Sequence, residues 1–583
     1  MVSVIIKDFT TSSWLELTSP KKVWSVFSDK EVTPCLVEID AEIANGSVVA
    51  GFIGYEASPA FDDSYVVRDK IDFNFPLLWF ASFNLNDAKI IDLANYRSTS
   101  RNFSAQLLPT ISLSKYRDDF IKIKDSIFQG ESYQVNYSFR AYGRVNSNLK
   151  DVFFDLIKKN NLPYASYIDT KHFTICSLSP ELFFRLDNKK IESHPMKGTI
   201  SRGLSSISDK ENFQKLKFSA KENAENIMIT DMVRNDLGKI AEIASVKTSC
   251  LCEIKKYQGA WQMISKVTAK INNPSLSSIL KALFPGASIT GAPKSKATQI
   301  ISSLEDSPRK IYTGAIGYWL PGKKAQFNLA IRSLLVDKKT GLAEYGTGSG
   351  IVWDSKCEKE FDECLLKANW FNQSSLTKKF SLLETIFWSK NNYPFLQGHL
   401  SRLTDSANYW DIKVERAHII KRLTKITTNF KPQTPYKVRL LLSLQGRITI
   451  KYDSLSPHFQ AFPNIKIAPQ PIDANNNFLY HKTTNRSIYQ KLLKKTGTTD
   501  LLLYNKKNML TETTIANIAV KIDNTLFTPP LECGLLPGVM RGYLLGKGVL
   551  REKNIPVSIL SKNPQIFLMN AIRGLQKVDV IPH

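Results

Sequence analysis

Long apolar runs are missing from this 583-residue sequence: the longest candidate, residues 75–83, is far short of the roughly 18 residues that a membrane-spanning helix needs. Cysteine is scarce as well. Among seven cysteines, Cys250 and Cys252 form the only close pair, which supplies neither a zinc site nor an even disulfide framework. Residues 1–8 are unlike a signal peptide. We therefore expect a soluble, cytoplasmic protein with no membrane partner.

Acidic residues are outnumbered, since 78 lysines and arginines face 53 aspartates and glutamates and give a net charge of +25. Such a charge can indicate a nucleic-acid partner. Here the basic residues are spread along the chain, often in pairs such as Lys21-Lys22 and Lys323-Lys324, without a basic tail or an RNA-binding aromatic strand. Compositional drift or an anionic substrate explains this pattern better, so we expect no nucleic acid. A basic nucleic-acid-binding protein built on inactive enzyme domains is the non-enzymatic alternative.

The length favours more than one domain. Residues 1–110 alternate short apolar runs with turn residues, and residues 110–370 alternate strand-like runs with a few helices. Residues 371–379 are polar and lack periodicity, which is typical of a linker. A new mixed pattern of strands and helices follows. We expect domains at residues 1–375 and 376–583.

Two serine-to-glutamate capping boxes, Ser219-Ala-Lys-Glu222 and Ser355-Lys-Cys-Glu358, predict the starts of two helices. Residues three apart are neighbours on one helix face. If the two helices face each other, their paired carboxylates could hold a hard divalent cation such as Mg²⁺. Each helix carries such a pair, Glu222 with Glu225 and Glu360 with Glu363.

The region that contains these two helices carries a series of motifs in a definite order, and together they indicate one protein family. They are Tyr133-Gln-Val-Asn136, Leu178-Ser-Pro-Glu-Leu-Phe183, Pro195-Met-Lys-Gly-Thr199, residues 224–236, 284–294 and 312–318, Ile331-Arg332, residues 346–355 and Glu360-Phe-Asp-Glu363. The set resembles the chorismate-utilising family, which includes anthranilate, aminodeoxychorismate, isochorismate and salicylate synthases. The resemblance covers about residues 115–370 and is weaker over residues 1–110. It implies an α+β fold of antiparallel sheets with outer helices.

Chorismate carries two carboxylates, so its site needs two ways to hold an anion. The resemblance implies that Glu225 and Glu363 ligate Mg²⁺, which binds the ring carboxylate, while Glu222 and Glu360 support the metal through water. The metal inverts the local charge, because acidic residues alone would repel the dianion. The remaining implied substrate-binding residues, which include those around the enolpyruvyl carboxylate, are Gln134, Thr199, Thr290, Tyr312, Arg332, Gly346, Gly348 and Gly350.

Three positions distinguish the branches of this family. Gln134 stands where members that add water carry a lysine, which favours ammonia as the nucleophile. Lys197 stands where anthranilate synthases carry an alanine, and Gln262 replaces a histidine linked there to loss of pyruvate. The resemblance implies that Lys197 attacks C2 of the ring as the C4 hydroxyl leaves, and that ammonia at C4 then expels the lysine. Glu181 is the implied general acid, and the apolar run after it could raise its pKa.

The motifs of the C-terminal region are Phe380-Ser-Leu-Leu-Glu-Thr385, His399-Leu-Ser-Arg-Leu403, Lys482-Thr-Thr-Asn-Arg486, residues 510–517 and Leu536-Pro-Gly-Val-Met-Arg541. They resemble the fold-type IV pyridoxal phosphate family, which includes aminodeoxychorismate lyase and the branched-chain and D-amino-acid aminotransferases. By this resemblance Lys482 forms the Schiff base and moves protons, and Glu512 pairs with the pyridinium nitrogen. The implied phosphate ligands are Arg402 and the backbone around Ile515, Val539 and Met540.

Together the resemblances imply two successive reactions. The first aminates chorismate to 4-amino-4-deoxychorismate, and the second eliminates pyruvate to give 4-aminobenzoate, a folate precursor. No Gly-x-Cys-x-Gly nucleophile elbow is present, so ammonia is expected from a separate glutamine amidotransferase subunit. An anthranilate synthase joined to an aminotransferase is the enzymatic alternative. A homodimer formed through the C-terminal domain is a further expectation.

Overall fold

The computed structural model describes residues 2–68, 75–93, 96, 107–145, 148–160, 162–257, 259–368, 380–456, 461–463 and 465–581. The chain forms two compact units, residues 1–201 with 213–377 and residues 202–212 with 378–583. The expected linker at 371–379 and the expected boundary between residues 375 and 376 lie outside the described residues. Nothing in the sequence predicted that residues 202–212 would pack with the second unit.

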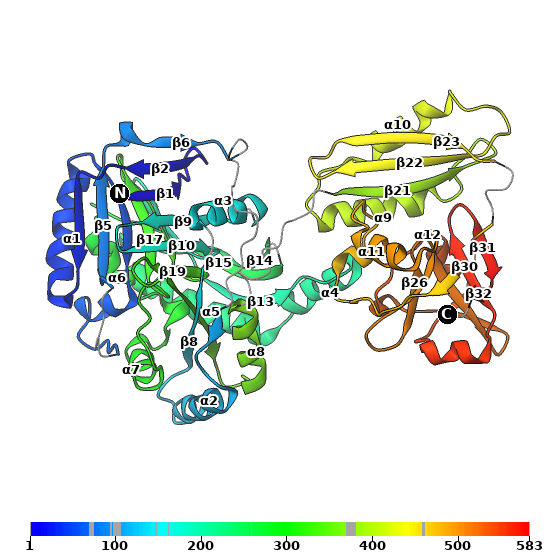
Figure 1. The fold of residues 1–583 in the computed structure, drawn as a ribbon. Helices are drawn as coiled ribbons and strands as arrows, with labels where there is room; N and C mark the ends of the chain where they lie inside the picture. Colours follow the sequence, from blue (N-terminus) through cyan, green and yellow to red (C-terminus); the bar gives the residue numbers. More distant parts are fainter. Residues whose placement is uncertain are drawn as a thin grey trace. The chain divides into compact units, whose positions relative to one another are not determined.

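Two large antiparallel sheets form the body of the first unit (Figure 1). In the first sheet the strand order is β16 (Gly291–Ala292), β8 (Gln134–Arg144), β20 (Leu342–Ile351), β19 (Ser333–Asp337), β10 (Phe173–Ser179), β9 (Tyr164–Asp169), β1 (Ser3–Lys7), β2 (Trp14–Thr18) and β6 (Lys89–Ile91), with β7 (Leu108–Pro109) beside β8. In the second sheet the order is β13 (Met196–Ser201), β15 (Ala260–Lys270), β12 (Lys190–His194), β11 (Leu182–Asp187), β18 (Lys324–Leu329), β17 (Ala315–Leu320), β4 (Val48–Ile53), β5 (Leu78–Phe83) and β3 (Lys22–Val26), with β14 (Lys247–Tyr257) beside β15.

The two sheets share one hydrophobic core. Side chains alternate across a strand, so every second residue can face the opposite sheet. Ile6 and Ile175 of the first sheet, together with Phe52 and Ile316 of the second, are buried in this common core. The sheets therefore form a sandwich whose outer faces are available to helices.

Helices cover the outside of this sandwich. Residues of α1 and α6 pack against the second sheet, those of α3 against the first sheet, and those of α2, α7 and α8 around β8. Their bounds are α1 (Asp29–Ala44), α2 (Leu113–Phe128), α3 (Leu149–Asn160), α6 (Leu276–Leu283), α7 (Lys294–Leu304) and α8 (Cys357–Ala368). The expected α+β class, with antiparallel sheets and outer helices, is confirmed.

Two helices bring the paired carboxylates to the sheets. The helix α5 (Ala220–Gly238) packs on β13 and β15, and α8 packs on β20. Half of the expected box forms at α5: the Ser219 side chain accepts a hydrogen bond from the Glu222 N–H, while the Ser219 N–H donates to the Leu216 carbonyl and not to Glu222. At α8 the expected box is wrong: the Ser355 hydroxyl donates to Glu360 at 2.8 Å and accepts from the Val352 N–H. Glu358 instead pairs with Arg117 at the surface.

The second unit contains two sheets. The smaller is antiparallel, with the order β21 (Ser381–Trp388), β22 (Tyr436–Ser443) and β23 (Ile448–Ser454), and α9 (Leu396–Tyr409) and α10 (Arg416–Thr427) pack on one of its faces. The larger is mixed, with β29 (Leu550–Glu552), β28 (Thr525–Thr528), β27 (Asn517–Ile522), β26 (Leu510–Thr513), β25 (Leu501–Tyr504), β24 (Ile465–Ile467) and β32 (Val580–Ile581), with β30 (Ile566–Asn570) beside β27 and β31 (Gly574–Val578) beside β30. This unit also contains α11 (Ser487–Thr496) and α12 (Val539–Gly546), together with the first part of α4 (Ser206–Lys217), up to residue 212.

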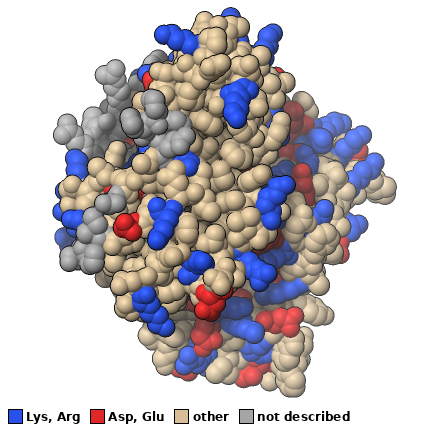
Figure 2. Space-filling view, turned by 90° about the vertical axis from the view of Figure 1, so that its right-hand side faces the viewer, with Lys and Arg blue, Asp and Glu red and all other residues tan. Residues whose placement is uncertain are grey.

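The surface agrees with the scattered charge of the sequence. On the face drawn in Figure 2, lysine and arginine side chains stand singly or in small groups with acidic side chains among them. Among the described helices, none has the length and apolar character that crossing a membrane requires.

Candidate active sites

Lys197, on β13, lies beside two of the other predicted residues. A Cβ atom added to Gly350 would lie 2.7 Å from Lys197 Nζ and 3.0 Å from Gln134 Nε2. The two polar groups thus occupy the space that a side chain at position 350 would fill. Segments from β8, β13 and β20, distant in sequence, meet here. We call this region the Lys197 site.

Several buried amides of the Lys197 site lack a protein partner among the described residues. Gln134 is fully buried, and neither its Oε1 nor its Nε2 takes part in a hydrogen bond. Asn136 Nδ2 and Gln262 Oε1 are in the same condition. Leaving such a group unsatisfied costs about 1–3 kcal/mol. Buried polar groups in native proteins are otherwise nearly always paired, so these amides indicate a site that receives a polar ligand.

Glu181 is buried where β10 passes into β11, close to Lys197. Its Oε1 accepts a hydrogen bond from the Ser288 hydroxyl at 2.6 Å and a longer one from the Met196 N–H at 3.4 Å. Burial raises the pKa of Glu181 to about 7, while the Ser288 hydrogen bond and the charge of Lys197 act in the opposite direction. A carboxyl group with this pKa can hold a proton near neutral pH and release it during a reaction.

The carboxylates of α5 and α8 influence each other at the edge of the Lys197 site. A Cβ atom on Gly198 would lie 3.2 Å from Glu222 Oε2, so this carboxylate adjoins β13. Burial, and then the charge of Glu225, raise the pKa of Glu222 to about 7. Burial also raises the pKa of Glu225, with Glu360 and Glu363 adding repulsion.

The chemistry of this acidic group fits a magnesium ion that is completed by substrate. Among the described residues, no three histidine, cysteine or acidic side chains lie close enough together to hold a metal ion. Mg²⁺ commonly binds through one or two protein carboxylates, with water and substrate oxygens as its other ligands. Glu225 and Glu363 could supply those two carboxylates. Glu360 is buried and bonded to Ser355, which suits an indirect contact.

Lys367 is a residue of this site that the sequence analysis missed. Its ammonium group lies 2.7 Å from Glu363 and donates a hydrogen bond to the Gly348 carbonyl at 2.9 Å. The charge of Lys367 lowers the pKa of Glu363, and that of Glu363 raises the pKa of Lys367 against the effect of burial. The i, i+4 spacing of the two residues on α8 was the signal that could have revealed the pair.

The predicted anion-binding residues lie on neighbouring strands and turns. A Cβ atom on Gly346 would lie 2.1 Å from the Tyr312 ring, so this glycine allows the ring to pack against β20. Arg332 has a φ of 52°, in the left-handed region that residues other than glycine seldom occupy. Such strained residues cluster at functional sites. Burial raises the pKa of Tyr345, and the charge of Arg332 acts in the opposite direction.

The two predicted threonines differ in their surroundings. Thr290 is fully buried, and its hydroxyl donates to the Gly286 carbonyl at 2.8 Å. Its carbonyl accepts from the Asn136 N–H at 2.9 Å, which ties it to β8. Thr199 is exposed on β13 and pairs in register with Gln262 on β15. A ligand in this site could reach the Thr199 side chain without moving the backbone.

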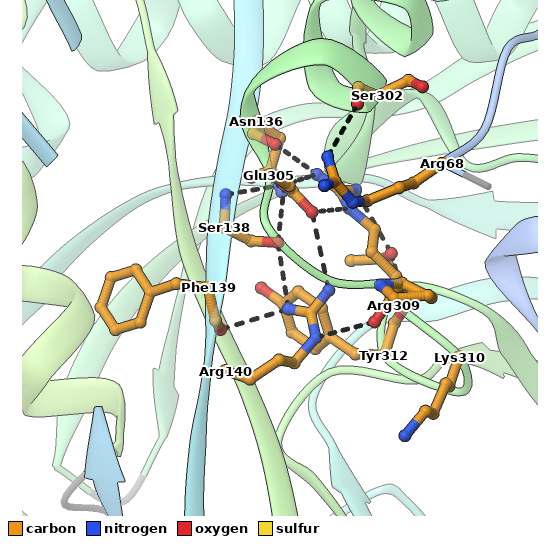
Figure 3. A network of polar contacts seen from close by, with 12 residues as sticks. Arg68, Asn136, Ser138, Phe139, Arg140, Ser302, Glu305, Arg309, Lys310 and Tyr312 are labelled. Carbon is orange, nitrogen blue, oxygen red and sulfur yellow. Dashed lines mark hydrogen bonds and ion pairs between the residues drawn. The ribbon is translucent and has the colours of Figure 1, made fainter. Parts of the chain in front are cut away.

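A buried ionic network behind Tyr312 holds the strands of the Lys197 site together (Figure 3). Arg309 donates to both Glu305 oxygens, at 2.6 and 3.0 Å, and to the carbonyls of Asn136 and Ile289. The guanidinium of Arg140 lies 5.1 Å from the centre of the Tyr312 ring. Sequence analysis did not predict this network. Its residues position the backbone around Gln134 and Thr290.

The second unit contains a cavity of about 540 Å³, which we call the Lys482 pocket. The Lys482 carbonyl accepts from the Leu383 N–H of β21 at 2.9 Å. Burial, reinforced by the charge of Arg402, lowers the pKa of Lys482 to about 8. Its amine is therefore closer to the neutral form than an exposed lysine. The pocket is lined by predicted residues, Arg402, Lys482, Glu512, Ile515 and Val539, together with residues that were not predicted.

Glu512 also lines the Lys482 pocket, where several hydrogen-bond donors fix its carboxylate. Tyr489 Oη donates to Oε1 at 3.0 Å, while Asn517 Nδ2 and the Leu536 N–H donate to Oε2 at 3.0 and 3.2 Å. Burial nevertheless raises the pKa of Glu512 to about 8. A protonated ring nitrogen would supply the cation that this buried carboxylate needs, which fits pyridoxal phosphate.

An arginine and a helix start, both predicted to bind phosphate, lie at the Lys482 pocket. Arg402 pairs with Glu384 at 2.5 Å and donates to the Pro537 carbonyl at 3.2 Å, and this pairing lowers the pKa of Glu384 to about 2. Gly538 precedes α12, whose first N–H groups can receive an anion. Val539 lines the pocket, but the Met540 side chain lies in the core, so Met540 could contribute only its backbone.

A cationic wall, formed by Lys437, Arg439 and Arg573, also lines the Lys482 pocket, and sequence analysis missed it. Lys437 and Arg439 alternate along β22 with buried apolar residues, and Arg439 pairs in register with Thr385 of β21. Two charged residues at alternate positions of an otherwise apolar strand were the available signal. They resemble an ordinary solvent-facing strand edge, so the pocket itself was needed to interpret them.

Comparisons with known proteins agree with both resemblances. Residues 18–373 match the family model for chorismate binding enzyme, and residues 381–581 match amino-transferase class IV. The chain is 35% identical over 256 residues to aminodeoxychorismate synthase component 1 of Escherichia coli K12, covering 44% of this chain and 56% of that protein. It is 32% identical over 337 residues to anthranilate synthase component 1 of Methanothermobacter marburgensis, covering 55% and 73%.

A solved structure supports the fold of the first unit. Anthranilate synthase component I of Streptococcus pneumoniae TIGR4 matches with a TM-score of 0.53 and 22% identity, covering 64% of this chain and 92% of that chain. At 22% identity this similarity supports the fold of the first unit alone. The chain spans between 29% and 64% of the length of the first aminodeoxychorismate synthases that it matches.

Proposed function

Because the chain belongs to the chorismate binding enzyme family and carries an amino-transferase class IV domain after it, we propose that it makes 4-aminobenzoate in two steps. The first unit would aminate chorismate to 4-amino-4-deoxychorismate, and the second would release pyruvate from that product. The observation that carries the proposal is the meeting of Lys197 with Gln134 at Gly350, on the same chain as a pocket lined by both Lys482 and Glu512.

In the proposed first step, Lys197 is the nucleophile and Glu181 the acid. The lysine amine attacks C2 of the ring while Glu181 gives its proton to the departing C4 hydroxyl. Ammonia then attacks C4 and expels the lysine, so that two displacements leave nitrogen on the face the hydroxyl occupied. Mg²⁺ held by Glu225 and Glu363 would bind the ring carboxylate and neutralise charge. Arg332 and Tyr312 would hold the enolpyruvyl carboxylate.

The pKa of Glu181 predicts a pH dependence for this step. Because the acid must be protonated and its pKa is about 7, the amination rate, compared at a fixed concentration of free ammonia, should gain an alkaline fall above pH 7 that comes from Glu181. Glu181→Gln should lower kcat by about 10²–10⁴-fold. Rates of 4-amino-4-deoxychorismate formation across the neutral range, on both sides of this pKa, would measure both effects. An alkaline fall near pH 7 that persists in Glu181→Gln would contradict this role.

In the proposed second step, Lys482 moves a proton and Glu512 keeps the cofactor ring protonated. When bound, pyridoxal phosphate would withdraw electrons from the substrate C4 that carries the amine. Lys482 then takes the C4 proton, enolpyruvate leaves, and the ring becomes aromatic. The cationic wall suits this substrate, because 4-amino-4-deoxychorismate retains both carboxylates of chorismate. An arginine and a lysine beside the reacting end can each bind one of them.

The cationic wall can be tested by removing its central charge. Arg439→Gln should raise KM for 4-amino-4-deoxychorismate by about 10-fold or more, since a hydrogen bond to a charged group contributes about 1.5–3 kcal/mol. The expected change in kcat is small, because Arg439 does not contact the reacting atoms. Steady-state pyruvate release would measure both. Lys421→Gln, on α10 at the other face of the sheet, is the control. An unchanged KM in Arg439→Gln would exclude this contact.

The proposal includes partners and cofactors beyond the chain itself. Ammonia would come from a separate glutamine amidotransferase subunit, and Mg²⁺ and pyridoxal phosphate would serve the first and second steps. We also propose that the functional division of the chain lies at residues 375–376, that the protein acts in the cytoplasm in folate biosynthesis, and that two copies associate through the C-terminal domain.

Product analysis tests the whole proposal. Purified protein would be incubated with chorismate, Mg²⁺, ammonium and pyridoxal phosphate, and the products identified by mass and fluorescence. We expect 4-aminobenzoate and pyruvate in equal amounts. Anthranilate instead would support the anthranilate synthase alternative. If no 4-aminobenzoate forms and an added keto acid is instead converted to the corresponding amino acid, the second unit would be an aminotransferase.

A further inference from the structure

Residues 202–212 lie within the part of the chain matched to the chorismate binding family, yet they pack with the second unit. Residues 202–205 lead into α4, and Asp209 in the first part of that helix closes the segment onto itself. We call residues 202–212, which include this first part of α4, the turn. Arg202 Nε and Nη2 donate to the two oxygens of Asp209 at 2.6 and 2.7 Å, and the Gly203 N–H donates to Asp209 Oδ1 at 2.9 Å. A two-point guanidinium–carboxylate pair fixes geometry as well as distance. The turn is therefore a preformed element of the second unit.

This turn rests on the end of α9. Arg202 Nη2 donates to the Tyr409 carbonyl at 3.2 Å, and its guanidinium lies 4.6 Å from the centre of the Tyr409 ring. Lys210 pairs with Asp405, one helical turn earlier on α9, at 3.1 Å. Leu204 packs into a core cluster that includes Leu479 and neighbouring residues. A cation–π contact, an ion pair and apolar packing together hold the turn against the end of α9.

Tyr409 in turn contacts His481. The two rings lie 4.2 Å apart between centres and are tilted by 35°. His481 is buried, with its Nδ1 3.0 Å from the Ser406 hydroxyl on the preceding turn of α9. The Trp410 ring contacts it edge-on at 5.8 Å. The His481 ring is thus fixed by three residues of one helix end.

His481 immediately precedes Lys482, and both line the Lys482 pocket. Successive Cα atoms are held about 3.8 Å apart across a trans peptide, so a displaced His481 would redirect the backbone from which the Lys482 side chain starts. On the other side, the Lys482 carbonyl is fixed by the Leu383 N–H. The position of the Lys482 amine therefore depends on what holds His481.

We infer that residues 202–212 are a positioning element of the Lys482 pocket, acting through Tyr409 and His481. The inference rests on the proposed role of Lys482 and adds a structural requirement to it. Residues that lie within the chorismate-family match therefore set the geometry of the Lys482 pocket. Changes in this turn should alter the second step and cofactor binding while leaving the first step intact.

Gly203→Ala is the sharpest test, because it adds one methyl group and removes no polar atom. The new Cβ would lie 2.1 Å from the Asp209 backbone nitrogen, so the turn must open. We expect at least a fivefold increase in the dissociation constant for pyridoxal phosphate, and a shift in the pH at which its bound absorbance changes. Pyruvate release from 4-amino-4-deoxychorismate should fall at least 10-fold, with amination within twofold of wild type.

Two further variants keep this test decisive. Gly546→Ala is the matched control and should behave as wild type, because Gly546 is exposed and a Cβ atom added there would meet no other heavy atom within 4 Å. Tyr409→Leu removes the ring that the turn contacts on α9, and it should reproduce the effects of Gly203→Ala. In the double variant the effects should not add, since both changes break one connection.

The inference and the proposed function fail in different ways. If the wild-type protein binds pyridoxal phosphate but releases no pyruvate, the proposed second step is wrong, and the cofactor titrations still test the turn. If Gly203→Ala and Tyr409→Leu bind the cofactor with wild-type affinity and show the wild-type absorbance transition, the inference is overturned.

Discussion

Lys482→Ala is expected to separate the two reactions, leaving amination of chorismate intact while pyruvate release falls by three orders of magnitude or more. The amine is the group proposed to hold the cofactor and to move the C4 proton, and general acid–base transfer alone contributes about 10²–10⁴-fold. Arg402 cannot take its place, because it is tied to Glu384 and Pro537. The variant should accumulate 4-amino-4-deoxychorismate, which mass spectrometry of the reaction mixture would detect.

Lys495→Ala is the control for this experiment. Lys495 is exposed at the end of α11, in the same unit, and its loss should leave both rates unchanged. Adding a separate active lyase to the Lys482→Ala mixture should restore 4-aminobenzoate. Pyruvate release at the wild-type rate by Lys482→Ala would show that another group performs the elimination.

Lys197→Ala should block the first of the two proposed reactions, the amination of chorismate. Without the amine there is no first displacement at C2, and direct attack by ammonia at C4 would have to occur without the lysine intermediate. We expect amination to fall by at least 10³-fold, while added 4-amino-4-deoxychorismate is still converted to 4-aminobenzoate and pyruvate. Gly350 and Gln134, which enclose the Lys197 amine, should otherwise keep the site intact.

The matched control for Lys197→Ala is Lys247→Ala, an exposed lysine at the start of β14. A second readout examines chemistry instead of rate: wild-type protein incubated with chorismate and no ammonium should gain the mass of a covalent adduct, and Lys197→Ala should not. Amination at the wild-type rate by Lys197→Ala would mean that ammonia attacks chorismate directly.

Sequence alone predicted much of both sites, because their main residues fall inside ordered motifs. Lys197 lies beside Gln134, and Lys482 and Glu512 line one pocket, as those motifs predict. Glu181 was expected to have a raised pKa from the apolar run that follows it, and its burial produces that shift. The order of the motifs along the chain predicted these site residues even where the hydrophobic periodicity of the surrounding sequence was weak.

Residues outside the motifs were not predictable in the same way. In the sequence Arg439 resembles an ordinary solvent-facing strand residue, and only the folded structure shows that it lines the Lys482 pocket. Ser355 and Glu358 have the spacing of a capping box, but Glu360 takes the Ser355 hydroxyl and Arg117 takes Glu358. In these cases the surrounding tertiary contacts decide the outcome, and the local pattern does not record them.

The division of the chain also bears on how its gene can be rearranged. Because residues 202–212 belong with the second unit, the polypeptide passes between units after residues 201, 212 and 377. A single break near residue 377 would yield a C-terminal fragment that lacks residues 202–212 of its own unit. A rearrangement of the gene would therefore keep all residues of the second unit only if it carried the short turn as well.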